Sequence, residues 1–477
     1  MVVTRFAPSP TGALHIGGLR TALYAYLFAK RNGGKFLLRI EDTDRSRYVE
    51  GAEENLESAL HWAGLSWDNA EIVRQSDRLD VYREHAERLV EEGKAYYCFC
   101  APERLARMRQ EQQREKRAPK YDRACLALER EDAKRRIDAG EKAVIRFRIP
   151  DEPENISFED SVRGKIGTHT EIIDDQVIMK SDGFPTYHLA SVVDDHESGV
   201  THVIRGEEWL SSTPKHILLY EAFGWEPPEF AHLPLLLNPD RSKLSKRQGD
   251  VSVEEYRENG YLPEALVNFV ALLGWNPGGG STEEFFTLAE LEGVFDLDAV
   301  NRAGAVFDLK RLDWMNAHYI RELPAEELLE RTKPFWEAFF EISNVDASAF
   351  DEAFLLRVLA IERERMAKLS DVGKGNPFFF ARLEVSREDL RWKDMPDEGV
   401  RASLDRALEA LRDLEDEDWT RDNLEQVLLA QCEEDKKGEF FWPVRMALSG
   451  AKKSPPPHEI AWVIGKEEAL ARLKASL

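Results

Sequence analysis

The sequence predicts an α/β fold that continues into an all-α C-terminal region. Val2 to Phe6 and Lys35 to Ile40 are short, mostly apolar runs of the kind that form buried parallel strands. Apolar residues between them, from Leu19 to Leu27, recur at helical spacing. From Ala325 onward the pattern is helical, apart from a breaker at Gly373 to Pro377.

Length and composition bound the class of protein. A chain of 477 residues should form about three or more domains. Hydrophobic residues make up 43% and charged residues 32%, as in ordinary water-soluble proteins. The N-terminus begins a strand directly, which argues against a signal peptide, and no apolar run is long enough to cross a membrane. Four cysteines in so long a chain argue against a disulfide framework and indicate a reducing cytoplasm.

The charge distribution is uneven. The net charge of −24, taken alone, argues against a nucleic-acid partner, because phosphate contacts need Lys and Arg. Residues 101–148, however, carry 15 Lys and Arg against 9 Asp and Glu. This basic region could orient an RNA on an acidic body, or it could be a solvated helical face, and the composition does not decide between the two.

The loop after the first strand suits a phosphate. Prolines on both sides of Ser9 make the loop stiff before anything binds. The helix that follows is expected to end at Asn32 to Gly34, so His15, Gly17 and Gly18 lie at its N-terminus. Free backbone N–H groups and the helix macrodipole favour an anion there, and an imidazole can donate to a phosphoryl oxygen. Such loops are also common as purely structural turns.

Acidic residues follow the second strand. Glu41, Asp42 and Asp44 lie at its C-terminal end, where ligands bind in open α/β sheets. They form either a turn with a capping Asp or a site for a cation such as an ammonium group or Mg²⁺.

Two arginines are expected near the same edge of the sheet. Arg205 ends a predicted strand, and Ser212 or Thr213 can cap the helix that follows. Arg205 and Tyr187 should therefore lie near the edge that also receives Arg5. Each arginine can bind a carboxylate bidentately, although a surface ion pair is the plainer interpretation of any single arginine.

Cysteines near the middle of the first half have the spacing of metal ligands. Cys98 and Cys100 form a Cys-x-Cys pair, and Cys125 follows. Three thiolates can hold Zn²⁺ with one position left to fill, whereas three reduced, partly buried thiols explain the pattern equally well.

Further helices and strands are expected along the rest of the chain. Helices are expected at 53–63, 82–92, 253–259 and 263–273, strands at 143–149 and within 164–178, and mostly helical structure at 101–140 and 287–316.

A second motif lies far downstream. Lys243-Leu-Ser245-Lys246-Arg247 places three cations and a hydroxyl on a short loop, and in isolation it would be a solvated charge run. Together with His15-Ile-Gly-Gly18 it resembles the KMSKS and HIGH motifs of class I aminoacyl-tRNA synthetases, with Gly18, Leu244 and Arg247 as variant positions.

Further stretches narrow the resemblance to bacterial-type glutamyl-tRNA synthetases. They are Ala7-Pro-Ser-Pro-Thr-Gly12, Ile40-Glu-Asp-Thr-Asp44, and residues 181–190, 203–209 and 307–316. The resemblance is strong over the first two thirds of the chain and weak over the last third. It implies a Rossmann-type catalytic domain (1–80 and 181–240) with an α/β acceptor-binding insertion (81–180). A stem-contact region with the KMSKS-like loop (241–322) and a helical anticodon-binding domain (323–477) are implied to follow.

The resemblance also implies the reaction and its residues. The enzyme would attach L-glutamate to tRNA-Glu with ATP and Mg²⁺, through a glutamyl adenylate, as a cytoplasmic monomer without membrane contact. The implied residues are His15, Lys243 and Lys246 for catalysis; His15, Gly17, Gly18, Lys243, Ser245 and Lys246 for ATP; Arg5, Ser9, Glu41, Tyr187 and Arg205 for glutamate, with Glu41 on its amino group; and Arg363 and Arg365 for the anticodon.

The family comparison leaves zinc open. Some members place a His two residues after the third Cys, but here that position is Ala127. A related family pattern, Cys-x-Cys followed by Tyr-x-x-x-Cys, matches Cys98, Cys100, Tyr121 and Cys125, so a phenolate could be the fourth ligand.

Three rival functions deserve comparison. A short paralogue that glutamylates a tRNA base lacks the C-terminal helical domain, and glutaminyl-tRNA synthetases differ in the context of the first motif. A synthetase-like protein that binds tRNA without charging it is disfavoured by the presence of His15, Glu41, Arg205 and Lys246. Whether tRNA-Gln is also charged, and which arginine takes the side-chain carboxylate, stay open.

Overall fold

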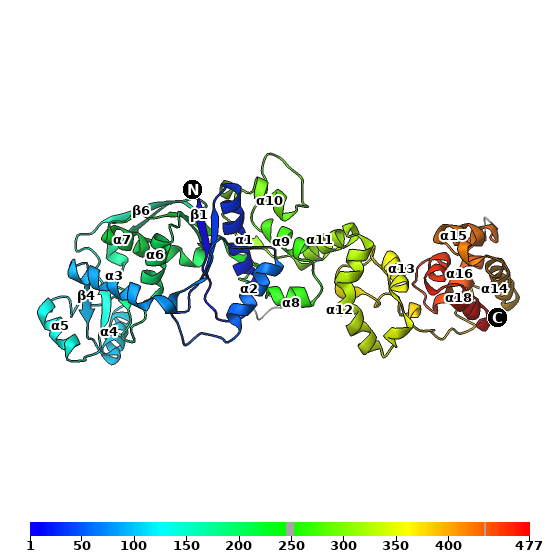
Figure 1. Cartoon of the computed structure of the whole chain (residues 1–477), viewed down its shortest axis with the longest axis horizontal. Helices are drawn as coiled ribbons and strands as arrows, with labels where there is room; N and C mark the ends of the chain where they lie inside the picture. The colour runs from blue at the N-terminus through cyan, green and yellow to red at the C-terminus, as the bar shows by residue number, and fades with distance from the viewer. Residues whose placement is uncertain (245–251, 434–435) are drawn as a thin grey trace. The chain divides into compact units, whose positions relative to one another are not determined.

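The predicted α/β region and the predicted helical region form two separate units of the chain (Figure 1). The computed structural model describes residues 1–244, 252–433 and 436–477. The first unit comprises Met1–Arg257 and Leu266–Leu309, and the second comprises Glu258–Ala265 and Lys310–Leu477. Within the described residues every strand belongs to the first unit, so the predicted fold class is confirmed.

Parallel strands carry the functional edge of the first unit. One sheet has the order β1-β2-β3 and another has the order β7-β6-β10-β9. The Val3 N–H donates to Thr201 Oγ1 (2.8 Å) and the Thr201 N–H donates to the Val3 carbonyl (2.9 Å), so β1 lies beside β9. The strands are β1 (Val3–Phe6), β2 (Lys35–Ile40), β3 (Val73–Arg74), β6 (Asn155–Asp160), β7 (Gly164–His169), β9 (His202–Gly206) and β10 (Glu229–Leu233).

Helices connect these strands and cover them. Leu19, Leu23 and Leu27 of α1 are fully buried, as their spacing predicts. Asn32 ends this helix, and Gly33 beyond it has φ of +60°, which glycine adopts readily. Helices that lie wholly or mostly in this unit include α1 (Ile16–Arg31), α2 (Ala52–Trp62), α3 (Leu79–Glu91), α6 (Tyr187–Glu197), α7 (Thr213–Phe223), α8 (Val253–Glu258), α9 (Pro263–Ala271) and α10 (Leu288–Val294).

The segment expected as an insertion, residues 81–180, divides between two sheets. β4 (Ala95–Cys98), β5 (Val144–Phe147) and β8 (Val177–Met179) form a separate antiparallel sheet, flanked by α4 (Pro102–Arg114) and α5 (Arg130–Asp138). The β6–β7 hairpin instead joins the sheet of β9 and β10, because β6 pairs with β10 in parallel. Part of the insertion therefore belongs to the sheet that carries Arg205.

Some local predictions need correction. β4 and β6 were not among the expected strands, because β4 has only four residues and β6 has only two apolar residues in six, which gives little signal. Residues 287–316 also contain β12 (Ala305–Val306), which pairs with β11 (Leu236–Leu237). Neither Ser212 nor Thr213 caps α7 through its side chain. Thr213 Oγ1 accepts a hydrogen bond from Arg205 instead, at 2.9 Å.

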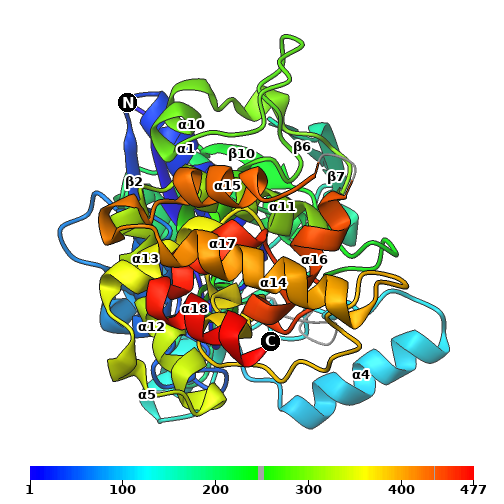
Figure 2. The ribbon, with the colours of Figure 1, turned by 90° about the vertical axis from the view of Figure 1, so that its right-hand side faces the viewer.

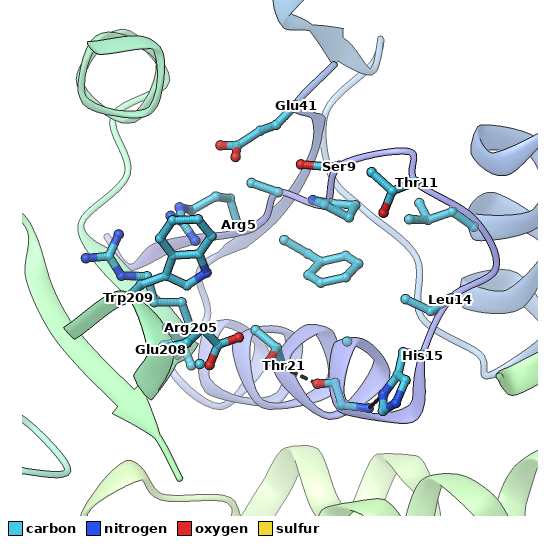
Figure 3. A pocket seen from close by; sticks show the side chains of 18 of the residues that line it. Arg5, Ser9, Thr11, Leu14, His15, Thr21, Glu41, Arg205, Glu208 and Trp209 are labelled. Carbon is cyan, nitrogen blue, oxygen red and sulfur yellow. Dashed lines mark hydrogen bonds between the residues drawn. The ribbon is translucent and has the colours of Figure 1, made fainter. Parts of the chain in front are cut away.

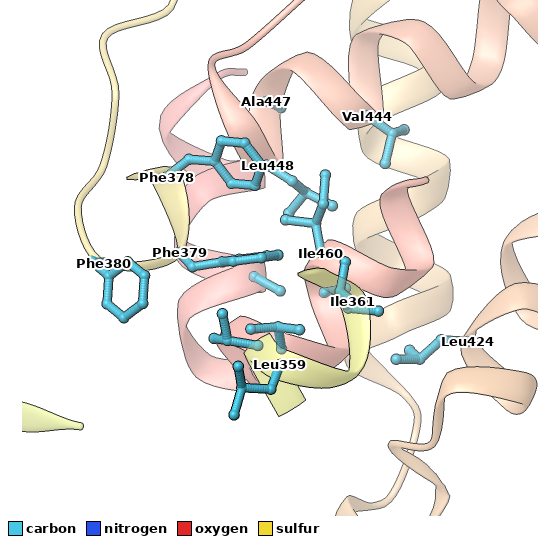
Figure 4. Close-up of a cluster of buried hydrophobic side chains, with 14 of the residues drawn as sticks. Leu359, Ile361, Phe378, Phe379, Phe380, Leu424, Val444, Ala447, Leu448 and Ile460 are labelled. Atoms are coloured by element: carbon cyan, nitrogen blue, oxygen red, sulfur yellow. The ribbon is translucent and has the colours of Figure 1, made fainter. Parts of the chain in front are cut away.

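The second unit is a set of helices around an aromatic and aliphatic core. Phe378 and Phe379 lie near Leu448 and Ile460 in this core (Figure 4). Its helices are α11 (Leu309–Glu322), α12 (Ala325–Ser343), α13 (Glu352–Glu362), α14 (Asp397–Arg412), α15 (Arg421–Ala430), α16 (Lys437–Ser449), α17 (Pro457–Ile464) and α18 (Lys466–Ala475). Among the described residues, no helix combines the length and the apolar character that a bilayer crossing requires.

One acidic side chain is buried in this second unit. Glu362 is only 3% exposed, and its carboxylate accepts hydrogen bonds from the Gly373 N–H (2.9 Å) and from Asn376 Nδ2 (3.0 Å). Burial raises the pKa of Glu362 to about 7, although these two hydrogen bonds oppose the rise. No Lys or Arg among the described residues forms an ion pair with it.

Glu362 should make the stability of the second unit depend on pH. Its pKa is higher in the folded chain than the ordinary value, so the folded state binds more protons between about pH 4.5 and pH 7. The stabilising contribution is complete below that window and is lost as the pH rises through it, by up to about 3 kcal/mol. Denaturant unfolding of the full chain across this range should show a steeper decline than in Glu362→Gln. The exposed neighbour Glu364 gives the control, Glu364→Gln, and identical slopes in all three proteins would contradict the prediction.

Candidate active site

A cavity of about 400 Å³ lies at the carboxyl ends of β1 and β9, beside the first turn of α1 (Figure 3). It brings the predicted phosphate loop and the predicted substrate residues into one site. The predicted residues in its wall are Arg5, Ser9, His15, Gly17, Gly18, Glu41, Tyr187 and Arg205. Glu41, Arg5 and Arg205 lie toward one side and His15 lies toward the other (Figure 3).

His15 begins α1 and caps it with its own ring. Its Nδ1 accepts a hydrogen bond from the Gly17 N–H at 2.9 Å. The amide of Gly17 is therefore not available to a phosphate, contrary to the expectation of free N–H groups there. Because Nδ1 accepts, the proton of a neutral ring must lie on Nε2, so this nitrogen can donate. A Cβ at Gly18 would lie 2.9 Å from Leu14 Cδ1, so a larger residue there would require the Leu14 side chain to shift.

Buried ion pairs fix the side chains of Arg5 and Glu41. Arg39 donates to Asp195 Oδ1 (2.7 Å) and to Glu41 Oε1 (3.1 Å), while Arg5 Nε donates to Asp195 Oδ1 (3.1 Å). Burial alone would raise the pKa of Asp195, but the two guanidinium groups hold it below its usual value. Burial raises the pKa of Glu41, and Arg39 and Arg5 limit the rise.

Asp194 extends this group of charges toward α3. Its carboxylate is fully buried and accepts hydrogen bonds from Gln75 Nε2 (2.8 Å), Arg78 Nε (3.0 Å) and the Tyr82 hydroxyl (2.9 Å). Arg39 Nε also lies 3.7 Å from it. Three guanidinium groups (Arg5, Arg39, Arg78) thus pair with three buried carboxylates (Glu41, Asp194, Asp195), and the partly exposed Arg78 also pairs with Glu197.

Arg205 differs from Arg5 because its partners are neutral. Its Nε donates to His232 Nε2 at 3.0 Å. Its terminal nitrogens donate to the Tyr187 hydroxyl (2.8 Å) and to Thr213 Oγ1 (2.9 Å). No carboxylate of the described ranges lies within ion-pair distance of it, and only 5% of the residue is exposed. The guanidinium therefore presents an uncompensated positive charge in the wall of the cavity.

A pair of histidines supports Arg205 from behind. His216 Nδ1 lies 3.4 Å from a terminal nitrogen of Arg205, and His216 Nε2 lies 3.0 Å from His188 Nδ1. Burial lowers the pKa of His188 to about 4, and the pKa of His216 falls well below its ordinary value for the same reason. Both rings are therefore neutral at pH 7 and add no charge beside Arg205.

Other predicted residues lie apart from this cavity. Lys243 is exposed and is not among the residues of the described chain that form the wall. Ser245 and Lys246 fall outside the described residues. Arg363 and Arg365 belong to the second unit. Arg363 donates to the carbonyls of Arg321 and Leu323, whereas Arg365 is exposed.

The three predicted cysteine ligands lie together. The sulfur atoms of Cys98, Cys100 and Cys125 are within 4.8 Å of one another, and the Tyr121 hydroxyl is 3.3 Å from the sulfurs of Cys98 and Cys100. Sulfurs about 2.3 Å from a tetrahedral zinc ion would be about 3.8 Å apart, close to the 3.6 Å between Cys100 and Cys125. The residues present therefore fit a zinc ion with little rearrangement.

Sequence reasoning missed the residues that hold the site in place. They are Arg39, Asp194, Asp195, Thr213, His216 and His232. One signal was available: Asp194 and Asp195 follow the mostly apolar run 189–193 of a buried helix, where unpaired acids are rare. The partners of these acids come from distant strands and could not be read from spacing.

Comparisons with known proteins cover the whole chain. The family model for the catalytic domain of class I tRNA synthetases (E and Q) matches residues 1–314, and an anticodon binding domain model matches residues 327–477. A glutamate–tRNA ligase of Chloroherpeton thalassium is 46% identical over 99% of this chain and 97% of that protein. A glutamate–tRNA ligase of Finegoldia magna is 43% identical over 100% and 99%. The crystal structure of a glutamate–tRNA ligase from Elizabethkingia meningosepticum, in complex with its amino acid, has a TM-score of 0.89 at 36% identity, covering 100% of this chain and 99% of that one.

Proposed function

We infer the function of this chain from the premise that it belongs to the class I tRNA synthetases of the glutamate and glutamine type, whose catalytic-domain model matches residues 1–314. Its full-length relatives are glutamate–tRNA ligases. The chain therefore attaches L-glutamate to the 3′ end of tRNA-Glu with ATP, through a glutamyl adenylate. The structural observation that supports this function best is a single cavity with a helix N-terminus at one side and an uncompensated guanidinium at the other.

The charges of the cavity suit an acidic amino acid. Glu41 offers a carboxylate to the ammonium group, and Ser9 and the Tyr187 hydroxyl offer hydrogen bonds. The reacting carboxylate must face the nucleotide beside His15, so the side-chain carboxylate projects the other way, toward Arg205. Arg205 is the better candidate for that carboxylate, because its charge has no acid partner among the described residues, whereas Arg5 is already paired with Asp195.

The phosphate loop would bind ATP, which enters as its magnesium complex. His15 Nε2 can donate to a phosphoryl oxygen, and Gly17 and Gly18 let the nucleotide approach closely. Lys243, Ser245 and Lys246 would neutralise the pyrophosphate, a role that rests on the sequence motif.

Neither chemical step needs a protein nucleophile. A carboxylate oxygen of glutamate attacks the α-phosphorus of ATP and pyrophosphate leaves. A ribose hydroxyl of the terminal tRNA adenosine then attacks the carbonyl carbon of the adenylate, and AMP leaves. The side chains of this chain act by positioning the reactants and by neutralising charge that builds on the phosphates.

The basic segment after β4 is the proposed contact for the acceptor end of tRNA. α4 contains no buried residue, and it extends outward from its unit (Figure 2). Its exposed arginines, with those of α5, give an acidic protein one region where phosphates are favoured. That the enzyme works as a monomer in the cytoplasm stays a prediction from the sequence.

The second unit offers a cavity suited to an unpaired base of the anticodon. The cavity, about 600 Å³, is lined by Trp392, Phe441, Trp442, Arg445 and Ser454 among others. The guanidinium of Arg445 lies 4.8 Å from the centre of the Trp442 ring. Arg445 Nε and Ser454 Oγ are buried without a hydrogen-bond partner in the described chain, so both could bond to the edge of a base. Aromatic rings beside such donors are typical of single-stranded RNA sites.

A zinc ion held by Cys98, Cys100, Cys125 and Tyr121 would fix the end of β4 to residues 121–125. The convergence of three sulfurs and a phenol supports this site. Arg104 lies 3.5 Å from the Cys100 sulfur, a contact that reduced thiols without a metal would also allow.

Charging assays test the main function. Purified tRNA-Glu should accept labelled glutamate in the presence of ATP and not in its absence. If tRNA-Gln is also charged in the same assay, the enzyme does not discriminate between the two tRNAs. If only tRNA-Glu is charged, the enzyme is discriminating. Failure to charge either tRNA, with ATP still bound, would refute the proposed reaction and favour a binding protein.

Arginine variants test the anticodon contacts. Arg445→Ala and Arg365→Ala should each raise the KM for tRNA-Glu by about fivefold or more, because a contact to an RNA base or phosphate is lost. The KM values for ATP and glutamate should not change. Arg401 on α14 is 72% exposed and forms only a 4.0 Å pair, so Arg401→Ala is the matched control. If either variant has the same KM for tRNA-Glu as Arg401→Ala, the substituted arginine does not contact the tRNA.

Elemental analysis tests the zinc site. Protein purified without chelators should contain about one zinc per chain, and Cys100→Ser should lose most of it. Cys432 is the one cysteine outside the cluster, so Cys432→Ser should keep the metal. Absence of zinc from freshly prepared wild-type protein would leave the reduced thiols as the correct interpretation.

A further inference from the structure

The orientation of Arg205 depends on one nitrogen of His232. Arg205 Nε donates to His232 Nε2 at 3.0 Å, and the Thr213 hydroxyl lies 3.2 Å from the same nitrogen. Arginine cannot accept a hydrogen bond, so Nε2 must offer a lone pair to it. The proton of the ring must then lie on the other nitrogen, Nδ1.

Asp160 is the partner that keeps the proton on that nitrogen. His232 Nδ1 lies 2.5 Å from Asp160 Oδ2, and both side chains are fully buried. Burial alone would raise the pKa of Asp160, but hydrogen bonds from His232 and from the Arg163 N–H hold it below its usual value. Asp160 is therefore ionised and can only accept, which selects the neutral ring with its proton on Nδ1.

The backbone fixes which oxygen of Asp160 faces the ring. Oδ1 accepts from the N–H groups of Val162 (3.0 Å), Arg163 (2.8 Å) and His232 (3.3 Å). Only Oδ2 is left for His232 Nδ1. The carboxylate cannot rotate without breaking these three bonds, so the turn of the β6–β7 hairpin holds Asp160 in a single orientation.

We propose that Asp160 and His232 are positioning residues for the glutamate carboxylate. Asp160 sets the proton of His232, and His232 aims the Arg205 guanidinium into the cavity. The hairpin of the inserted segment thus takes part in substrate recognition without touching the substrate. This inference rests on the proposed function, in which Arg205 binds the side-chain carboxylate of glutamate.

Asp160→Asn is the decisive substitution. The three backbone N–H groups require the amide oxygen at the position of Oδ1, so the amide NH₂ must face His232 Nδ1. The ring would then carry its proton on Nε2, directly opposite Arg205 Nε–H. The two donors repel, and Arg205 turns away from its place in the cavity. We expect the KM for glutamate to rise by about tenfold or more, with the KM for ATP unchanged.

Three comparisons make the result interpretable. Glu159→Gln alters the exposed neighbour in the same strand and should leave every KM unchanged. Arg205→Lys should raise the KM for glutamate, because an ammonium group cannot bind a carboxylate bidentately. If it does not, the assignment of Arg205 to the carboxylate is wrong. If Arg205→Lys raises the KM for glutamate but Asp160→Asn has the same KM for glutamate as Glu159→Gln, the positioning proposal is overturned while the proposed function stands.

A second variant decides the case if Asp160→Asn does not fold. Glutamine at position 232 can donate its NH₂ to Asp160 and accept from Arg205 with its carbonyl, which reproduces the required arrangement. His232→Gln should therefore keep the KM for glutamate within about threefold of the wild-type value. A rise as large as that of Arg205→Lys would overturn the proposal.

Discussion

The active site depends on a set of paired charges, of which Arg5, Arg39, Glu41, Asp194 and Asp195 are buried and Arg78 is partly exposed. Arg39 links Glu41, which follows β2, to Asp194 and Asp195 on α6. Arg5 on β1 also pairs with Asp195. Burying any one of these groups alone would cost several kcal/mol, and breaking a buried pair typically costs about 3–5 kcal/mol. The set is stable only when all its members are present, so it fixes two strands and a helix in one arrangement and with them the side chains of Arg5 and Glu41.

Arg205 follows the opposite principle. A guanidinium paired with a carboxylate has little electrostatic energy left for a ligand, whereas Arg205 is held by a hydroxyl, a phenol and imidazole rings. These partners satisfy its N–H groups without cancelling its charge. The neutrality of His188 and His216, which follows from their lowered pKa values, preserves this condition. The cavity thus combines a balanced region that supplies rigidity with one unbalanced charge that supplies affinity for an anion.

Local chemistry was predictable from the sequence, and the long-range support of the site was not. The strand, loop and helix around His15, the end of α1 at Asn32 and the two arginines near one edge follow from residue spacing and turn residues. The partner of Arg5 lies 190 residues away, at Asp195, and no periodicity reveals it. Thr213 shows the limit clearly. Its position before a helix predicts a cap, but its hydroxyl is recruited by Arg205 because a buried guanidinium has the stronger need for an acceptor.

The insertion also limits what spacing can reveal. Its antiparallel sheet, β4-β5-β8, is distinct from the sheet that carries Arg205, yet its hairpin returns to pair with β10 and places Asp160 behind His232. β6 and β7 belong to the sheet that carries Arg205. A change in the hairpin turn therefore reaches Arg205 through two hydrogen bonds, one between Asp160 and His232 and one between His232 and Arg205, rather than through a flexible loop. An acid is therefore required at this turn, since any residue that donates there reverses the proton position of the His232 ring and with it the orientation of Arg205.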